Sequence, residues 1–440
     1  MVDVQFQKQR IPDFFWLLGL VLLGLLVATA QPVKGQTAQP PDTCAMPFQP
    51  VAVPLTELGT AEYVRMDGTP TGFEGGLYPD GRNVRPSLHE EAGLNISRQI
   101  HPLSKEGRLD EENGRILLIS IGMSNTATEF AAFTRLAQQK AEINPRLVLI
   151  NGALPNQIAE RWANPEGIAW QELDRKITGY GFSSQQVQVA WVKLTNTGGG
   201  EFPQKALALE ADLQKVIQLL KERFPNLRLV FLSSRTRSYT YWRGLSPEPL
   251  AYETGFAVKW LIEKQIRGDP ELNFDPERGE VKAAYLSWGP YLWSDGENPR
   301  EDGFLWLASD LTKDCTHPSS SGAEKVARQL WEFFSTDTIT RDWFLFPTTA
   351  SSPTAVEEIF ISTPVSRATS SNTPPVPTKI TTPVPQNTPA SLGMTSSPEP
   401  AGEEVNSTKS AFPTGLGVTL LLALVGISVV WGWLQARKKD

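Results

Sequence analysis

The chain has 440 residues, of which 40% are hydrophobic, including 20 Phe and 13 Trp, so it can build the core of one large domain or two ordinary ones. Its net charge of -7 argues against nucleic acid as a partner. Two cysteines and three histidines argue against a metal site built from these residues, and we predict neither a metal nor a cofactor.

The N-terminal segment has the order of features found in an export signal. Lys8 and Arg10 precede an apolar run over residues 14–30, and small residues and a Gln-Pro pair follow it. This order predicts a secretory signal over residues 1–36. The apolar run is somewhat long for a signal, so an uncleaved N-terminal anchor is the alternative.

The C-terminal part is predicted to tether the chain to a membrane. Residues 347–410 are rich in Ser, Thr and Pro and cannot bury enough apolar surface to fold, so we expect a disordered stalk. An uncharged apolar run follows and ends before a basic tail, residues 435–440. We therefore predict a single transmembrane helix over residues 413–434 with its tail in the cytoplasm. The chain would be a single-pass protein of the cell membrane whose folded part is extracytoplasmic.

Between these ends we expect one folded domain, residues 114–346, with an N-terminal extension, residues 40–113, packed on it. Within the extension, Ser87 and Glu90 predict a helix start with a capping box. In the domain, apolar runs alternate with helical patterns, which indicates an α/β fold with a parallel sheet. The predicted strands are Ile116–Ile121, Arg146–Ile150, Val187–Leu194, Leu227–Ser233 and Val281–Ser287, and the predicted helices are Glu129–Glu142, Gln204–Arg223, Tyr252–Gln265 and Ala323–Phe334.

Ser124 follows the first of these predicted strands. The strand is apolar throughout, as is usual for a strand that is buried on both faces. Thr126 and Glu129 predict a capping box at the start of the next helix. Ser124 would then lie at the carboxyl end of a strand and near the positive end of a helix dipole, where open α/β sheets bind ligands. A simple helix-capping role for this serine explains the pattern equally well.

A second polar cluster lies between the last predicted strand and the last predicted helix, whose start carries a capping box of Ser321 and Glu324. In this cluster Asp314 stands three residues before His317. A carboxylate so placed can hold one imidazole nitrogen and leave the other free as a base. With a serine at another strand end, the set supplies a nucleophile, a base and a group that orients the base. An Asp that caps a helix beside a surface histidine is the simpler alternative.

Two further strand ends carry candidate oxyanion donors. Gly152 follows the second predicted strand, and the missing side chain lets its backbone N–H approach a ligand. Asn196 follows the third predicted strand, and its side-chain amide can donate to a developing oxyanion. Both residue types are also common in ordinary turns.

The order of Ser124, Gly152, Asn196 and His317 along the chain resembles the four signature blocks of the SGNH (GDSL-type) hydrolase superfamily. The block Asp314-x-x-His317-Pro-Ser is the most similar. The resemblance implies a flavodoxin-like three-layer α/β/α sandwich with a mostly parallel five-stranded sheet. It also implies that Ser124 is the nucleophile, His317 the base and Asp314 the orienting carboxylate. The backbone N–H groups of Ser124 and Gly152, with the Asn196 amide, would form the oxyanion hole.

The resemblance extends over residues 113–335 and departs from the family pattern in two blocks. The first block usually reads Gly-Asp-Ser, and here Met123 stands in place of the Asp. The third usually reads Gly-x-Asn-Asp, and here Thr195 precedes the Asn and Thr197 follows it. These departures bear most on the third block and leave the class of substrate open.

Aromatic and basic residues after the fourth and fifth predicted strands are candidates for substrate binding. Aromatic rings among polar groups suit stacking on sugar rings, and they suit the packing of a long loop equally well. Arg235 and Arg237 could bind an anionic substrate. The candidates are Arg235, Tyr241, Trp242, Trp288 and Trp293.

We predict an exported, membrane-tethered serine ester hydrolase that acts through an acyl-enzyme. Its substrate would be a small-molecule or carbohydrate ester, such as an O-acyl group on a cell-surface or extracellular sugar. An O-acyltransferase is a close variant. A non-catalytic surface module that binds glycan or protein through the same cleft is the alternative from another class.

The two cysteines of the chain, Cys44 and Cys315, both fall in the part that we expect to be exported. Disulfides persist in such compartments, so we predict a bridge between them. Two free buried thiols are the alternative.

Overall fold

The computed structural model describes residues 48–346 of the chain. Cys44 and four predicted segments lie outside the described residues, namely the signal (1–36), the stalk (347–410), the transmembrane helix (413–434) and the basic tail (435–440). Across residues 48–346 the structure has no helix that is both long enough and apolar enough to span a bilayer.

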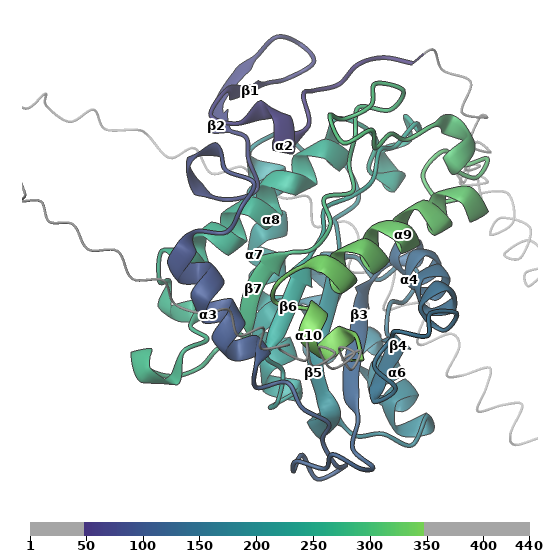
Figure 1. Cartoon of the computed structure of the whole chain (residues 1–440). Coiled ribbons are helices and arrows are strands. Elements are labelled where there is room, and N and C mark those ends of the chain that lie inside the picture. Colours follow the sequence, from purple (N-terminus) through teal and green to yellow (C-terminus); the bar gives the residue numbers. More distant parts are fainter. Residues whose placement is uncertain (1–47, 347–440) are drawn as a thin grey trace, which may run out of the picture. The chain divides into compact units, whose positions relative to one another are not determined.

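A five-stranded sheet forms the centre of the described part (Figure 1). The strands are β3 (Ile116–Gly122), β4 (Leu147–Asn151), β5 (Val187–Lys193), β6 (Leu229–Leu232) and β7 (Tyr285–Trp288). Their order is β4-β3-β5-β6-β7, and each neighbouring pair is parallel. β3 and β5 therefore lie inside the sheet, and every residue of both strands is buried. This burial on both faces explains why their sequences are almost continuously apolar.

Helices cover both faces of the sheet, which gives an α/β sandwich of three layers (Figure 1). The main helices are α4 (Ser124–Ala137), α6 (Ile168–Gly179), α7 (Gln204–Arg223), α8 (Leu250–Ile266) and α9 (Ser320–Thr336). Side chains alternate along β3. Leu117 and Ile119 pack in one core with α6, α7 and α8. Ile116 and Leu118 pack in a second core with α4 and α9.

Residues 48–113 pack on this domain through a small hairpin and a helix. The elements are β1 (Glu62–Val64), β2 (Pro70–Glu74) and α3 (Ser87–Ser97), which begins one residue before the start that a cap at Ser87 requires. The Tyr63 hydroxyl donates to Glu253 of α8 at 3.2 Å, and Lys259 of the same helix donates to the Tyr78 carbonyl at 2.9 Å. The extension is thus joined to α8 by buried hydrogen bonds as well as by apolar contacts.

The three predicted capping boxes are wrong, because the residues involved take other partners. Glu90 forms an ion pair with Arg85 and does not cap α3. Glu129 forms an ion pair with Lys193 and does not cap α4. The side chain of Ser319 caps α9, which begins two residues earlier than the predicted box of Ser321 and Glu324 requires.

Candidate active site

Ser124 is the first residue of α4, and a single residue, Met123, separates it from the end of β3. The turn between strand and helix is tight at Gly122. A Cβ on Gly122 would lie 2.2 Å from Thr126 Oγ1, so only glycine fits at this point. Backbone N–H groups in the first turn of a helix have no partner within the helix. The turn therefore presents the Ser124 hydroxyl together with free N–H groups and the positive end of a helix dipole.

Ser124, His317 and Asp314 form a hydrogen-bonded chain, although the serine and the histidine are 193 positions apart. Ser124 Oγ lies 2.7 Å from His317 Nε2. His317 Nδ1 lies 2.5 Å from Asp314 Oδ2. The three sequence-predicted residues are therefore brought together with the two imidazole nitrogens directed to the two predicted partners. This geometry allows the hydroxyl to pass a proton to His317 while the carboxylate fixes the tautomer.

The Asp314 carboxylate is held in place by four donors. Its Oδ1 accepts from the backbone N–H groups of His317 at 2.9 Å and Thr316 at 3.1 Å, and from the Thr312 hydroxyl at 2.8 Å. Partial burial alone would raise the pKa of Asp314. These hydrogen bonds and the one from the imidazole outweigh burial and lower the pKa below its usual value. Asp314 therefore stays ionised at the pH where a histidine base works.

A cavity of about 340 Å³ opens at Ser124 and His317. It is built at the carboxyl ends of β3, β4, β5 and β6, where ligands bind in open α/β sheets. Residues from five loops or helix starts contribute to its wall. The lining residues are Met123, Ser124, Asn125, Asn156, Ile158, Arg161, Thr195, Thr197, Arg235, Gly244, Leu245, Ser246, Thr316 and His317.

The predicted oxyanion donors are only partly placed at this cavity. Ser124 lines it, and its backbone N–H belongs to the first turn of α4. Gly152 follows β4, is buried and does not line the cavity, and a Cβ on it would lie 2.5 Å from the Ser120 carbonyl oxygen. Asn196 is misplaced for the predicted role. Its Nδ2 donates to Asp212 at 2.6 Å and its Oδ1 accepts from the Glu160 N–H at 3.0 Å, so both ends of the amide are used in holding loops together.

The two tryptophans predicted after the fifth strand are core residues and do not line this cavity. Trp288 is 2% exposed and donates through Nε1 to the Leu77 carbonyl at 2.6 Å. Trp293 is fully buried and donates to Glu248 at 2.9 Å. Their prediction as substrate-binding residues is therefore wrong, and the alternative of loop packing holds.

Tyr241 and Trp242 are about half exposed, and neither is among the residues that line this cavity. The Trp242 ring rests against Gly244, where a Cβ would lie 3.1 Å from two ring atoms. Gly244 itself lines the cavity. The exposed indole ring of Trp242 therefore adjoins a residue of the cavity wall.

The two arginines of the same tract have different surroundings. Arg237 is buried, donates to Asp295 at 2.7 Å and to the Gln49 carbonyl at 2.7 Å, and so joins the extension to the domain. Arg235 is also buried, but it lines the cavity and donates to the Thr316 hydroxyl at 3.1 Å. Of the two arginines that the sequence proposed for anion binding, only Arg235 therefore lines the cavity.

Several site residues carry no local sequence signal and were not predicted. Asn125 is buried, and its Nδ2 donates to the Thr316 carbonyl at 2.7 Å, which ties the start of α4 to the loop of His317. Asn156 and Arg161 line the cavity from the segment after β4. Their positions depend on contacts between distant segments. The sequence feature that could have indicated a site role for Asn125 is its position directly after the candidate nucleophile.

Beneath the cavity, Lys193 and Glu129 form a fully buried ion pair with N–O distances of 2.6 and 2.7 Å. Lys193 ends β5 and Glu129 lies one turn into α4. Burial lowers the pKa of Lys193 to about 8, against the raising effect of the glutamate. The pair explains why a charged residue occurs at the end of the buried strand β5 and another on the buried face of α4. It also joins α4 to β5.

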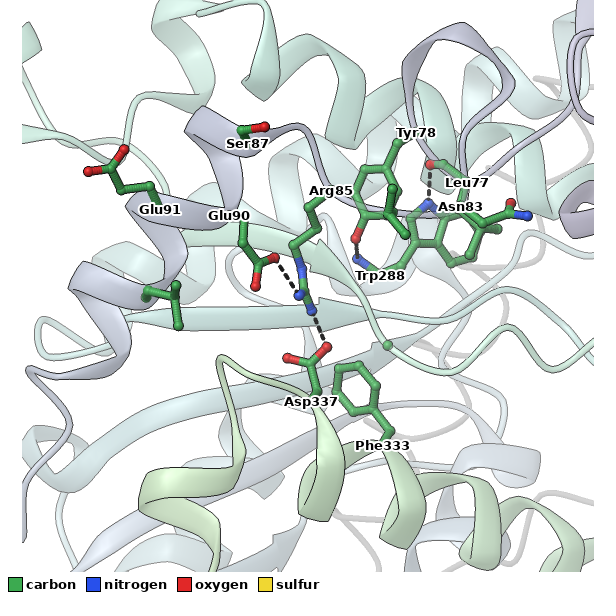
Figure 2. Close-up of a pocket in the computed structure, with 13 residues that line it drawn as sticks. Leu77, Tyr78, Asn83, Arg85, Ser87, Glu90, Glu91, Trp288, Phe333 and Asp337 are labelled. Carbon is green, nitrogen blue, oxygen red and sulfur yellow. Dashed lines mark hydrogen bonds and ion pairs between the residues drawn. The ribbon is translucent and has the colours of Figure 1, made fainter. Parts of the chain in front are cut away.

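A larger cavity of about 660 Å³ lies elsewhere, between the extension and the end of β7. Figure 2 shows Arg85 directed between Glu90 and Asp337, with which it forms ion pairs at 2.8 and 2.5 Å. Trp288 lines this cavity beside Tyr78. Arg85, Glu90 and Asp337 satisfy one another, and no nucleophile–base pair is present among the lining residues. Its size therefore does not make it the catalytic site.

Cys315 is buried and disulfide-bonded, and its backbone has a φ of 62°. Cys44, the predicted partner, lies outside the described residues. The pairing of the two therefore stays a prediction.

Comparison with models of known protein families found no match, and comparison with curated protein sequences found none. Solved structures are similar at low identity. A carbohydrate esterase family 3 from Talaromyces cellulolyticus is 10% identical with a TM-score of 0.29, over 49% of this chain and 94% of that one. The lipopolysaccharide acetyltransferase periplasmic domain of Salmonella ser. Paratyphi A is 12% identical with a TM-score of 0.29, over 56% and 95%.

A family two carbohydrate esterase from Clostridium thermocellum, in complex with cellohexaose, is 13% identical with a TM-score of 0.31, over 50% of this chain and 63% of that one. Because the identities are so low, we infer the chemistry from the geometry of the site itself.

Proposed function

We propose that the protein is a serine ester hydrolase with Ser124 as nucleophile, His317 as general base and acid, and Asp314 as the residue that orients the base. The observation that carries the proposal is the continuous chain from Ser124 Oγ through both imidazole nitrogens to the Asp314 carboxylate. Nucleophile and base lie within hydrogen-bond reach, and the base is oriented by a third group, as covalent acyl transfer requires.

In the first half-reaction, Ser124 Oγ bonds to the acyl carbon while its proton passes to His317 Nε2. The tetrahedral intermediate collapses when the bond to the leaving oxygen breaks and His317 returns the proton to that oxygen, which leaves as an alcohol. In the second half-reaction, a water oxygen bonds to the acyl carbon while one water proton passes to His317 Nε2. The bond between the acyl carbon and Ser124 Oγ then breaks, His317 returns the proton to Oγ, and the carboxylic acid leaves. Free N–H groups at the start of α4 are positioned to receive the negative charge of the intermediates.

We further propose that the alcohol is a carbohydrate. The exposed Trp242 ring supplies a flat aromatic face beside Gly244, a residue that lines the cavity. Most of the residues that line the cavity are of polar type, and their Asn, Thr and Ser side chains can hydrogen-bond to hydroxyl groups. Both features suit a sugar better than a fatty acyl chain.

Labelling with a fluorophosphonate probe tests the catalytic proposal. The full-length protein should be labelled at Ser124 and should hydrolyse 4-nitrophenyl acetate, and both signals should vanish in Ser124→Ala. Ser320→Ala is the matched control, because Ser320 is also the first residue of a helix but does not line the cavity. A protein that is folded yet neither labelled nor hydrolytic would contradict the proposal and favour the binding-module alternative.

An O-acyltransferase would share the first half-reaction and pass the acyl group to a sugar hydroxyl. Product analysis separates the two activities. Release of free acid in the presence of excess sugar acceptor supports a hydrolase, whereas transfer of the acyl group to the acceptor supports the transferase.

We also propose that residues 40–410 lie outside the cytoplasm, tethered by a transmembrane helix over residues 413–434. The export-type N-terminus and the basic tail support this topology. Protease added to intact cells should release a soluble fragment cut within residues 347–410. Resistance of the whole chain until the membrane is broken would contradict it.

A further inference from the structure

Arg235 is a buried cation in the wall of the candidate active site that makes no ion pair among the described residues. Only 5% of its surface is exposed. Its Nη2 donates to the Thr316 hydroxyl at 3.1 Å, and its buried Nε has no hydrogen-bond partner. Because an arginine side chain remains charged at any physiological pH, this side chain brings an unneutralised charge to the cavity.

The carboxylates nearest to Arg235 are engaged by other groups. Glu129 is paired with Lys193, and Asp314 is held by the loop of His317. Glu248 accepts from two backbone N–H groups and from the Trp293 ring nitrogen. These carboxylates support the charge of Arg235 from a distance, in opposition to burial, which lowers its pKa. None of them neutralises it by direct contact, and buried charges normally have a direct partner.

The rest of the cavity wall has the same sign. Among its lining residues are two arginines, Arg161 and Arg235, and no aspartate or glutamate. Arg161 is exposed and donates to the Asn156 carbonyl, so it too is free of a carboxylate. The chain as a whole carries a net charge of -7, so this positive cavity contrasts with the protein around it. A low-dielectric cleft lined by one sign of charge concentrates ligands of the opposite sign.

We propose that Arg235 binds a carboxylate of the substrate, so that the preferred ester is an O-acylated acidic sugar of the uronic-acid type. This inference rests on the proposed function. The planar guanidinium matches a carboxylate with two parallel hydrogen bonds. Because Arg235 contacts Thr316, the residue before His317, a carboxylate bound there would lie close to the catalytic base and would position the sugar for attack by Ser124.

Two other roles for Arg235 predict different behaviour. An arginine that only stabilised the oxyanion would aid neutral and acidic esters equally. An arginine that only held the loop of Thr316 in place would affect every substrate and the fold. Selectivity between a neutral and an acidic substrate is therefore the property that separates the three roles.

The test compares two substrates that differ only in the carboxylate. The methyl glycosides of O-acetyl glucuronic acid and of O-acetyl glucose, acetylated at the same hydroxyl, are hydrolysed by the full-length protein, and the ratio of their kcat/KM values is measured. We expect the wild type to prefer the glucuronide. Arg235→Gln should lower this preference by about 10- to 100-fold, the range for hydrogen bonds to a charged group. Arg98→Gln, at an exposed arginine that directly follows α3 and lies outside the cavity, should keep the wild-type ratio.

A direct binding measurement keeps the inference testable without turnover. Glucuronate, but not glucose, should bind to the full-length protein in calorimetry, and Arg235→Gln should abolish this binding. Arg235→Lys, which keeps the charge but loses the planar fork, should bind glucuronate weakly, and urea unfolding verifies that each variant is folded. Inorganic phosphate should compete only weakly. A ratio that is equal in wild type and Arg235→Gln, or phosphate binding as strong as that of glucuronate, would overturn the proposal.

The two proposals fail in different ways. Absence of fluorophosphonate labelling with retained, Arg235-dependent glucuronate binding would contradict the hydrolase and leave the anion site standing. Ser124-dependent hydrolysis of both sugars at equal rates would leave the hydrolase standing and remove the anion site.

Discussion

The Asn125 side-chain amide donates to the Thr316 carbonyl at 2.7 Å, and so joins the residue after the candidate nucleophile to the residue before the candidate base. Both groups are buried. The two loops that carry Ser124 and His317 come from opposite ends of the domain sequence, and this hydrogen bond fixes their separation. The distance between the reacting groups therefore depends on a residue that performs no chemistry.

Asn125→Ala should lower kcat by about 10²-fold, the cost of misplacing reacting groups by about 1 Å, with little change in KM. The unpartnered Thr316 carbonyl should also lower the free energy of unfolding by about 1–3 kcal/mol. Steady-state kinetics and urea unfolding measure the two effects. Asn95→Ala, at an exposed asparagine of α3, is the control. An unchanged kcat in Asn125→Ala would show that the loops are held by other contacts.

Asp314→Asn should lower kcat by about 10²–10⁴-fold, because an amide cannot both accept the backbone hydrogen bonds and hold the tautomer of His317 that leaves Nε2 free. In the wild type the Asp314 pKa is lowered, so its carboxylate stabilises the fold above the ordinary carboxyl pKa. That stabilisation should be lost only as the pH falls through the lowered value. Unfolding free energies of wild type and variant should therefore differ at pH 7 and converge in strong acid.

The oxyanion hole should use Asn156 and not Asn196. Asn156 lines the cavity, and its side-chain amide makes no hydrogen bond within residues 48–346. If it donates to the oxyanion, Asn156→Ala should lower kcat by about 10²–10³-fold at nearly constant KM. Asn196→Ala should chiefly lower stability, through loss of the bonds to Asp212 and the Glu160 N–H. A larger kcat loss in Asn196→Ala than in Asn156→Ala would restore the family-derived assignment.

The sequence predicts those features that depend on local pattern. β3 is recognisable because both of its faces are buried, which leaves no polar residue in the strand until Ser120. The helix α7 begins and ends at the predicted residues, since its apolar positions recur with helical period over the whole segment. Asp314 and His317 are linked by their spacing of three residues, a distance that one loop spans without help from the rest of the fold.

Features that depend on distant partners could not be predicted. Asn196 is turned from the cavity by Asp212, 16 positions away on α7. Glu129 does not cap α4 because it forms an ion pair with Lys193, 64 positions away. Trp288 is buried by the extension, whose Leu77 carbonyl lies 211 positions from it. In each case the residue type suits two roles, and only the packing of separate segments decides between them.

The disulfide prediction concerns Cys315, which lies between Asp314 and His317 in sequence. A bridge to Cys44 would tie the N-terminal extension to the catalytic loop and close a long loop, which stabilises a fold by roughly 5 kcal/mol at most. Mass spectrometry without reduction should find the Cys44 and Cys315 peptides linked. Reduction should lower both the free energy of unfolding and the rate of ester hydrolysis. A Cys315 peptide joined to another molecule, or free, would contradict the bridge.

His89 should make the stability of the fold depend on pH. Its ring is buried against Tyr285 at a centroid distance of 4.3 Å, and Nε2 donates to the Leu286 carbonyl at 2.8 Å. Burial lowers the pKa of His89 to about 4, with smaller opposing effects from the Leu286 hydrogen bond and Glu90. The ring therefore remains neutral in the fold, although it takes up a proton in the unfolded chain near the ordinary value of about 6.5.

Because the unfolded chain binds this proton first, the free energy of unfolding should fall as the pH drops from about 6.5 to about 4, by about 3 kcal/mol at most. His89→Gln keeps a donor for the Leu286 carbonyl but cannot be protonated, so its stability should lose this component of the pH dependence. His101→Gln, at an exposed histidine, should retain it. Urea unfolding at pH 7, 6, 5 and 4 measures the difference between the two variants. Parallel curves for wild type and His89→Gln would show that His89 is charged in the folded protein or reaches solvent.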